Sequence, residues 1–341
     1  MNSSGLIYDA SALQYGAWGV SGSLISALGL LGNVLSIIVL SDHRFRSSTS
    51  VYLICLAVVD MLVLVSMLLC FSLPAISNYT DQLDFYNSEI FPRMNPYAYP
   101  LALTAQTCSV FITVAFTIER YIVVCKPLKA NKLCTVKRAR RYAILVILIS
   151  LIYNVPRWFE FKLSDTNDNN TTVQMLTALG DNQLYNYIYK VYMYTIIIVI
   201  GPFLFLLCLN AALVRTLHRA NRNMQQSKHS AQEHNITVVI IIVVGTFLVC
   251  QLPSIPDNIC GAIYSSAEVR ESPNLIRLHT LSNLMVISNS AVNFFLYAVF
   301  GKKFRRVFRL KLNFCFGIPI KNQQHTDFTT IPMINTNNGA V

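Results

Sequence analysis

A small set of polar side chains in otherwise uncharged stretches of the sequence has the chemistry to bind a cation. Asp60 is the only carboxylate deep inside such a stretch, and Asn289 and Asn293, four residues apart, would share one face of a helix. Ser109 and Asn33 lie within two other stretches. If the chain brings them together, their oxygens form a small cavity suited to a sodium ion, with water completing the shell. The alternative is a neutral Asp60 hydrogen-bonded to the asparagines without an ion, and the residues alone leave both open.

Other reactive residue types lack the spacing that catalysis or metal binding needs. Six histidines occur without metal-ligand spacing, and the sequence has no phosphate-binding loop and no nucleophile motif. An enzyme is therefore the least favoured class, and we expect no cofactor to be required. None of the nine cysteines lies in segments 74–95 or 160–189. Cys315 follows the basic stretch from Lys302 to Lys311 and is a candidate for palmitoylation, with an inert thiol as the alternative.

The stretches that must position these residues are long and apolar. Of the 341 residues, 54% are hydrophobic and 13% charged, against about 45–50% and 25% in a soluble domain. Seven windows are nearly free of charge, and most reach the roughly 20 residues that a helix needs to cross a bilayer. The fourth is short, so we extend it to Phe159, with Arg157 reaching toward the lipid headgroups. The windows are residues 10–41, 47–80, 94–118, 142–156, 191–214, 234–256 and 278–301.

The connections between these windows alternate in charge, which predicts the topology. One alternate set carries 21 of the 27 basic residues with 4 acidic ones, and the other set is net acidic. By the positive-inside rule the basic set is cytoplasmic, which places the N-terminus outside and the C-terminus inside. The net charge of +11 therefore reflects membrane topology rather than a nucleic-acid partner. The basic set comprises residues 41–46, 119–141, 215–233 and 302–341.

Glycosylation sequons agree with this topology. The acceptor sites Asn2, Asn78, Asn169 and Asn170 all fall on the side assigned outside. The predicted fold class is an all-α membrane protein, a seven-helix bundle that crosses the plasma membrane several times. The expected divisions are an extracellular tail (1–19), a seven-transmembrane domain ending in a short amphipathic cytoplasmic helix (20–314) and a cytoplasmic tail (315–341).

Five motifs, in order along the predicted helices, resemble those of rhodopsin-like G-protein-coupled receptors, and the resemblance covers residues 20 to 314. They are Gly32-Asn33, Leu56-Ala57-Val58-Val59-Asp60, Glu119-Arg120-Tyr121, Phe247-x-x-Cys250-Gln251-Leu252-Pro253 and Asn293-Phe294-Phe295-Leu296-Tyr297. Three further runs are similar to the invertebrate FMRFamide-type neuropeptide receptors. The first extends from Tyr99-Pro100-Leu101-Ala102-Leu103 through Glu119-Arg120-Tyr121, and the others are Asn289-Ser290-Ala291-Val292-Asn293 and Gly301-Lys302-Lys303-Phe304-Arg305.

The resemblance is incomplete at positions that the family uses for bracing and switching. The family's cysteine at the outer end of the third helix would fall near Asn95, and the second outer loop has no cysteine partner. This disulfide is therefore lost at both ends. Gln251 stands in place of the usual helix-six tryptophan, Phe294 replaces the helix-seven proline, and Asn210 replaces a helix-five tyrosine. The fold should survive these changes, but the family's switching steps cannot be carried over intact.

The resemblance implies a peptide ligand rather than a small amine or retinal. Ala102 stands where an amine receptor needs an aspartate, and helix seven holds no lysine for a Schiff base. The pocket would lie between the outer halves of helices three, six and seven. We expect Gln106 and Gln251 to contact the buried end of the peptide, and Asp257 or Glu160 to pair with its arginine. The predicted ligand-binding residues are Tyr99, Gln106, Glu160, Gln251, Ile255, Asp257, His279 and Asn283.

The resemblance also implies coupling to a heterotrimeric G protein. At rest Arg120 would bridge Glu119 and Glu233, and agonist binding would swing helix six outward about Pro253 to open a cleft. Leu128 would offer the partner an apolar contact. The alternatives are a helix-dipole role for Glu233 and an interfacial anchor for Arg120. The predicted activation and coupling residues are Glu119, Arg120, Tyr121, Leu128, Glu233, Phe247, Pro253, Asn293 and Tyr297.

Arrestin and receptor kinases are further expected partners, because Ser227, Ser230, Thr329 and Thr330 permit phosphorylation. The alternative functions are a receptor for a different amidated neuropeptide and a multi-span transporter or channel, whose spans would also carry buried Asp and Asn. Against a transporter, the sequence shows no internal repeat and no matching pair of interrupted helices. Agonist-driven GTP exchange, rather than solute flux, would separate these classes.

Overall fold

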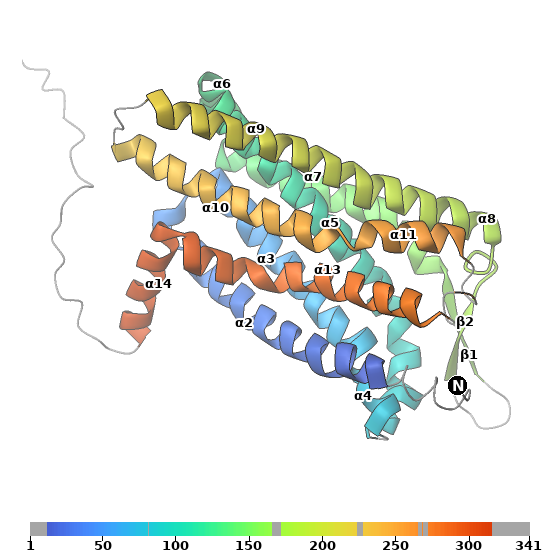
Figure 1. The fold of residues 1–341 in the computed structure, drawn as a ribbon. Coiled ribbons are helices and arrows are strands. Elements are labelled where there is room, and N and C mark those ends of the chain that lie inside the picture. The colour runs from blue at the N-terminus through green and yellow to red at the C-terminus, as the bar shows by residue number, and fades with distance from the viewer. Residues whose placement is uncertain are drawn as a thin grey trace, which may run out of the picture.

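The computed structural model describes residues 12–80, 82–165, 172–223, 228–264, 268 and 272–315; of these, the side chains of 165, 220–223, 228–236, 262 and 315 are outside the description. The described residues form a bundle of long helices with a two-stranded hairpin at one end and helix α14 at the other (Figure 1). We call these the hairpin end and the α14 end. Spans one to seven are Ala12–Leu40, Ser48–Thr80, Tyr86–Cys125, Val136–Phe159, Gln183–Arg219, Thr237–Gly261 and Pro273–Phe300.

Several spans combine α-helix with short π-helical segments. Spans one to three contain η1 (Tyr15–Gly22, π), α2 (Ser23–Leu40), α3 (Ser48–Met67), η3 (Leu68–Ser72, π), α4 (Leu73–Thr80), η4 (Tyr86–Ile90, π) and α5 (Phe91–Cys125). Spans four and five contain α7 (Val136–Asn154), the tighter turn η5 (Val155–Phe159), α8 (Gln183–Tyr185), η6 (Asn186–Met193, π), η7 (Thr195–Ile200, π) and α9 (Gly201–Asn223). The other elements are η2 (His43–Phe45), α6 (Pro127–Leu133), β1 (Phe161–Asp165), β2 (Thr172–Leu176), α10 (Lys228–Gln251), α11 (Ser254–Ile263), α13 (Pro273–Phe300) and α14 (Lys302–Cys315).

The seven predicted spans are confirmed, and several helices extend beyond their charge-free windows. Span three begins at Tyr86, whereas its window begins at residue 94. In this extension Arg93 Nη2 lies 3.0 Å from Glu89 Oε2, one helical turn away, so the charges pair on the helix surface instead of ending the helix. A charge-free window therefore locates the lipid-crossing part of a helix but not its solvated end.

Span four ends at Phe159 as predicted, but Arg157 does not reach the lipid headgroups. Its side chain is buried, with Nη1 3.3 Å from Glu160 Oε1 and the guanidinium 5.2 Å from the ring centre of Tyr189. The prediction of a headgroup contact was wrong, because a carboxylate and an aromatic ring offer partners inside the bundle.

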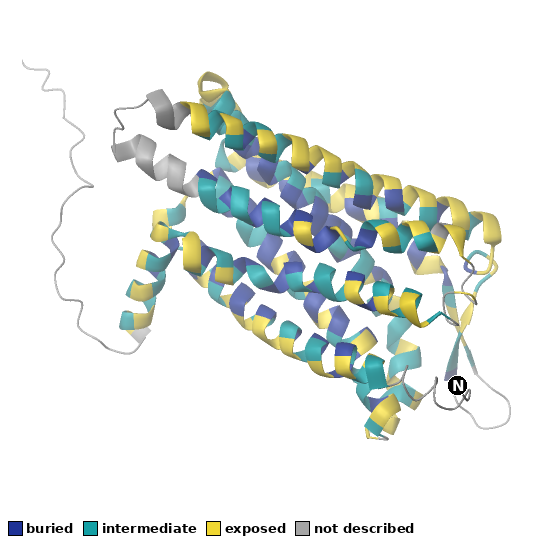
Figure 2. Ribbon diagram, in the orientation of Figure 1, coloured by how far each residue is buried: buried dark blue, intermediate teal, exposed yellow. Residues whose placement is uncertain are grey.

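Burial distinguishes the central span from the peripheral one. In span three 56% of the most apolar window is buried, against 22% in span four, so span three lies centrally and span four at the edge. The core between α3, α5, α9 and α10 contains Ile112, Phe116, Leu206 and Val244. Buried residues line the inward helix faces while exposed ones point outward (Figure 2). Large apolar side chains cover this outward surface, as a lipid-facing bundle requires.

Small residues bring α2 against α13. A Cβ atom added at Gly29 would lie 2.7 Å from both Ala291 Cβ and Leu64 Cδ1, and one added at Gly32 would lie 2.9 Å from Phe294 Cβ. Transmembrane helices approach this closely where an interface residue has no side chain. The spacing fixes how the helix carrying Asn33 meets span seven.

The hairpin is a β element that the hydropathy pattern does not reveal. β1 pairs antiparallel with β2, with Phe161 opposite Leu176 and Asp165 opposite Thr172. Both strands lie in the connection between spans four and five, outside every apolar window. The sequons Asn169 and Asn170 lie in their connection, and Asn2 in the first residues of the chain; all three are outside the described residues.

Helix α14 is the short helix predicted after the seventh span. Lys311 Nζ lies 3.4 Å from Oδ2 of Asp42, which ties α14 to the turn after span one. The Arg44 backbone N–H donates to Asp42 and holds the pKa of its carboxyl below the usual range. Cys315 ends the helix, and its side chain is outside the described set.

Candidate functional site

The polar residues in the middle of the bundle meet around Asp60. Its side chain is 0% exposed; Ser109 Oγ donates to Oδ1 at 2.9 Å and Asn293 Nδ2 donates to Oδ2 at 2.8 Å. Asn33 of span one is buried as well, and its Nδ2 donates to the Ser290 carbonyl at 2.9 Å. Spans one, two, three and seven therefore converge on one polar centre.

The atoms around Asp60 fit a small hard cation. They are carboxylate, amide and hydroxyl oxygens, the ligands that such cations prefer. Asn289 is buried one helical turn before Asn293, which donates to Asp60. In the described part of the chain, Asn289 itself makes no direct hydrogen bond to Asp60. Asn33 Oδ1, Ser36 Oγ and Tyr297 Oη are buried without a hydrogen-bond partner among the described residues. Such atoms are normally satisfied by a water or an ion.

Three of the predicted ligand-binding residues form a hydrogen-bonded row at the hairpin end. His279 Nδ1 lies 3.2 Å from Oδ2 of Asp257, and Asn283 Nδ2 lies 3.0 Å from His279 Nε2. Ser282 Oγ donates to Ser254 Oγ at 3.1 Å and joins the same two helices, α11 and α13. The His279 side chain is 60% exposed and that of Asp257 16%. The row thus presents an imidazole and a carboxylate at the outer parts of spans six and seven.

The other predicted ligand-binding residues lie on spans three and six. Tyr99 and Gln106 are half-buried on α5. Gln251 is buried at the end of α10, and Ile255 is half-buried on α11. The Tyr99 ring meets Phe161 of β1 edge-on, with 6.4 Å between the ring centres. Tyr99 therefore lies against the hairpin.

Glu160 is enclosed, and its carboxylate is already bound within the protein. The side chain is 1% exposed; Arg157 Nη1 and Tyr185 Oη donate to Oε1 at 3.3 and 2.7 Å, and Lys190 Nζ lies 3.0 Å from Oε2. The expectation that Glu160 pairs with a ligand arginine does not fit this geometry, because two cations already flank it. Sequence reasoning missed Tyr185 and Lys190, and the signal that pointed to such a cluster was Arg157, a cation in an apolar span.

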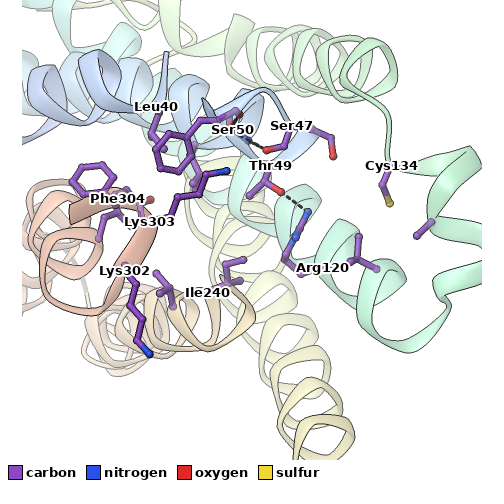
Figure 3. Close-up of a pocket in the computed structure, with 18 of the residues that line it drawn as sticks. Leu40, Ser47, Thr49, Ser50, Arg120, Cys134, Ile240, Lys302, Lys303 and Phe304 are labelled. Carbon is purple, nitrogen blue, oxygen red and sulfur yellow. Dashed lines mark hydrogen bonds between the residues drawn. The ribbon is translucent and has the colours of Figure 1, made fainter. Parts of the chain in front are cut away.

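A cavity of about 670 Å³ opens at the α14 end of the bundle (Figure 3). Its walls come from the end of α2, the start of α3, α5, α6, α10, the end of α13 and the start of α14. The lining combines hydroxyls of residues 47–50 with the cations Arg120, Lys302 and Lys303. Cys134 also lines it, and burial raises the pKa of its thiol, which keeps that group uncharged.

Arg120 and Glu119 form a compact cluster beside this cavity. Arg120 Nη2 lies 2.8 Å from Glu119 Oε1 and donates to Thr49 Oγ1, and Ser48 Oγ donates to Glu119 Oε1 at 2.9 Å. The two charged side chains are 5% and 6% exposed. These bonds tie the end of span three to the start of span two. Glu233, the second predicted partner of Arg120, lies in α10 with its side chain outside the description.

The remaining predicted activation residues are distributed along the bundle. Phe247 is buried in the core, and Tyr297 lines the cavity. Helix six is interrupted at Pro253, between α10 and α11. Leu128 on α6 is 93% exposed, and Lys126 Nζ lies 5.8 Å from the ring centre of Tyr121. Leu128 is thus open to a partner.

The sequence is similar to those of known proteins. The family described as 7 transmembrane receptor (rhodopsin family) matches residues 32–297. The FMRFamide receptor of Drosophila melanogaster is 33% identical over 309 residues, 89% of this chain and 55% of that protein, so the chain spans about half its length. The probable G-protein coupled receptor frpr-1 of Caenorhabditis elegans is 31% identical over 306 residues, 84% of this chain and 76% of that protein. The thyrotropin-releasing hormone receptor of Bos taurus is 27% identical over 331 residues, which cover 87% of this chain and 78% of that protein. These matches, together with the seven spans of the structure, show that the chain belongs to the rhodopsin family of seven-transmembrane receptors.

Proposed function

We propose that this chain is a plasma-membrane receptor that binds an extracellular FMRFamide-like neuropeptide and activates a heterotrimeric G protein. The ligand class is carried by the similarity to the Drosophila FMRFamide receptor, which covers 89% of this chain. A second relative, the FMRFamide peptide receptor frpr-18 of Caenorhabditis elegans, is 28% identical over 86% of the chain. The hairpin end would be extracellular and the α14 end cytoplasmic, in accord with the basic connections.

The peptide would enter between spans three, six and seven at the hairpin end. Two carboxylates were considered as partners for the peptide's arginine, and Asp257 is the one that remains available. Its neighbour is His279, which carries a positive charge only when protonated, so the Asp257 charge is not permanently neutralised. Glu160 instead stabilises the wall of the site through its ion pairs within the protein. Gln106 and Gln251 offer amide groups to the buried end of the peptide. Replacing Asp257 with Lys should lower peptide potency more than replacing it with Asn, because a like charge repels the arginine.

At the α14 end, activation would separate α10 from the Arg120 cluster and widen the cavity. The break at Pro253 supplies a point about which the inner part of helix six can swing. A helix of the G protein would then contact Arg120 in the cavity and Leu128 on its rim. Arrestin and receptor kinases would use the same surface. In the inactive state a sodium ion held by Asp60, Ser109, Asn289 and Asn293 would oppose this change.

The test is a panel of amidated peptides applied to cells that express the chain with a G-protein reporter. RF-amide peptides should stimulate GTP exchange, whereas the same peptides with a free carboxyl end should be much weaker. Thyrotropin-releasing hormone serves as the competing ligand, because its receptors are 26–27% identical to this chain. A response to that peptide alone would replace the proposed ligand class. Solute flux without GTP exchange would favour the transporter or channel.

A further inference from the structure

The hairpin rests against α5 through side-chain hydrogen bonds. Asn95 Nδ2 donates to Gln174 Oε1 at 2.9 Å, and Arg93 donates from Nε and Nη2 to Thr172 Oγ1, both at 3.3 Å. Thr172 and Gln174 are two residues apart in β2, so their side chains leave the same face of the hairpin. One face of β2 is therefore attached to the outer part of span three.

The base of the hairpin is anchored to spans four and five. The Thr177 N–H donates to the Glu160 carbonyl at 2.9 Å, and Thr177 Oγ1 donates to the Phe159 carbonyl at 2.6 Å. The buried Glu160 carboxylate in turn holds Arg157 and Lys190. Because the base is fixed in this way, the contacts with α5 decide whether the rest of the hairpin lies over the bundle.

No cysteine takes part in this attachment. Segments 74–95 and 160–189 contain none, and the eight cysteines that the structure describes are all free. Asn95 stands near the position where the resemblance places one half of a disulfide to the second outer loop. Its hydrogen bond to Gln174 joins those same two elements.

We propose that Asn95 and Gln174 form a non-covalent fastening that takes the place of this disulfide and sets how long a bound peptide stays beneath the hairpin. The second half of the proposal rests on the proposed peptide-receptor function. A disulfide holds its two ends permanently, whereas a neutral hydrogen bond allows brief opening. Losing one such bond should raise the open population about fivefold.

The first experiment measures hydrogen exchange of the hairpin amides, residues 161–165 and 172–176, in the full chain purified in lipid nanodiscs. Asn95→Leu has nearly the same shape but has no amide, so Gln174 Oε1 loses this donor. It should speed exchange about fivefold, the change expected on losing one hydrogen bond. Gln174→Glu keeps the acceptor and is the matched control, with exchange near that of the wild type. The double variant Asn95→Asp with Gln174→Lys pairs opposite charges at the same two positions and should keep protection near that of the wild type.

The second experiment follows dissociation of a labelled RF-amide peptide from the same four proteins. Dissociation should be about fivefold faster from Asn95→Leu, and near the wild-type rate from the control and the double variant. Unchanged hairpin exchange in Asn95→Leu, or loss of wild-type protection on adding a thiol reductant, would overturn the fastening. Unchanged dissociation from a variant whose hairpin exchanges faster would overturn its role in ligand residence. If no peptide activates the wild type, the proposed function fails, and the exchange experiment still decides the fastening.

Discussion

At the scale of single residues, Arg120 is held by partners on a neighbouring span. It donates to Thr49, and the Glu119 carboxylate that it contacts also accepts from Ser48. Removing the Thr49 hydroxyl should release Arg120 in part, because a hydrogen bond to a charged group contributes about 1.5–3 kcal/mol. Thr49→Val should therefore raise basal GTP exchange several-fold at matched surface expression.

Three further variants sharpen this prediction. Thr246→Val removes a hydroxyl that, among the described residues, donates to the Ile242 carbonyl of its own helix, and should leave the basal rate unchanged. Arg120→Ala should lower agonist-driven exchange while peptide binding persists. Glu233→Ala should also raise the basal rate if its carboxylate shares Arg120. A baseline in Thr49→Val equal to that of the wild type would show that the resting state is held elsewhere, and the centre around Asp60 would be tested next.

A second prediction at this scale concerns Asp60. If sodium binds the resting state, it should weaken agonist binding, because a ligand that prefers one state shifts the population toward it. Asp60→Asn should abolish this sensitivity, whereas Ser72→Ala, at another buried hydroxyl of span two, should keep it. Agonist affinity is measured in sodium and in a bulky organic cation. Equal wild-type affinity in both media would favour the dry network that the hydrogen bonds to Ser109 and Asn293 already form.

At the scale of elements, the contact between α2 and α13 depends on Gly29. A Cβ there would lie 2.7 Å from Ala291 Cβ, well inside contact distance, so Gly29→Ala must push the helices apart. Overpacking of this kind costs about 1–3 kcal/mol, and the thermal unfolding temperature should fall. The control is Gly245→Ala in α10, where no described atom of another helix lies within 4 Å of the new Cβ. Alanine has a higher helix propensity than glycine, so the thermal unfolding temperature of this control should not fall. Equal losses in both variants would contradict the close contact.

At the scale of the whole molecule, the distribution of charge predicts which end faces the cytoplasm. Asn78 lies at the hairpin end, is exposed, and accepts from Asn87 Nδ2 at 2.6 Å through its oxygen. We expect Asn78→Gln to remove one glycan, seen as a mobility shift that deglycosylation of the wild type reproduces in part. An N-terminal tag should be detected on intact cells, and a C-terminal tag only after permeabilisation. The opposite staining pattern would reverse the assignment of the two ends.

The sequence by itself determined the seven spans, the polar residues of the centre and the family. Spans follow from composition because a bilayer accepts only long runs of apolar residues whose backbone is satisfied internally. Asp60, Ser109 and Asn293 were recognisable for the same reason, since polar groups in lipid must find partners. These signals are local and need no knowledge of the fold.

Only the tertiary structure decided which groups pair across the bundle. Ser48 and Thr49 meet Glu119 and Arg120 across 71 residues of sequence, and Asn95 meets Gln174 across 79. Arg157 turned inward rather than to the headgroups, and Glu160 was occupied rather than open to a ligand. In each case the choice was between partners of similar chemistry. That choice is made by which helices and strands lie side by side, and hydropathy and charge patterns along a chain carry no information about it.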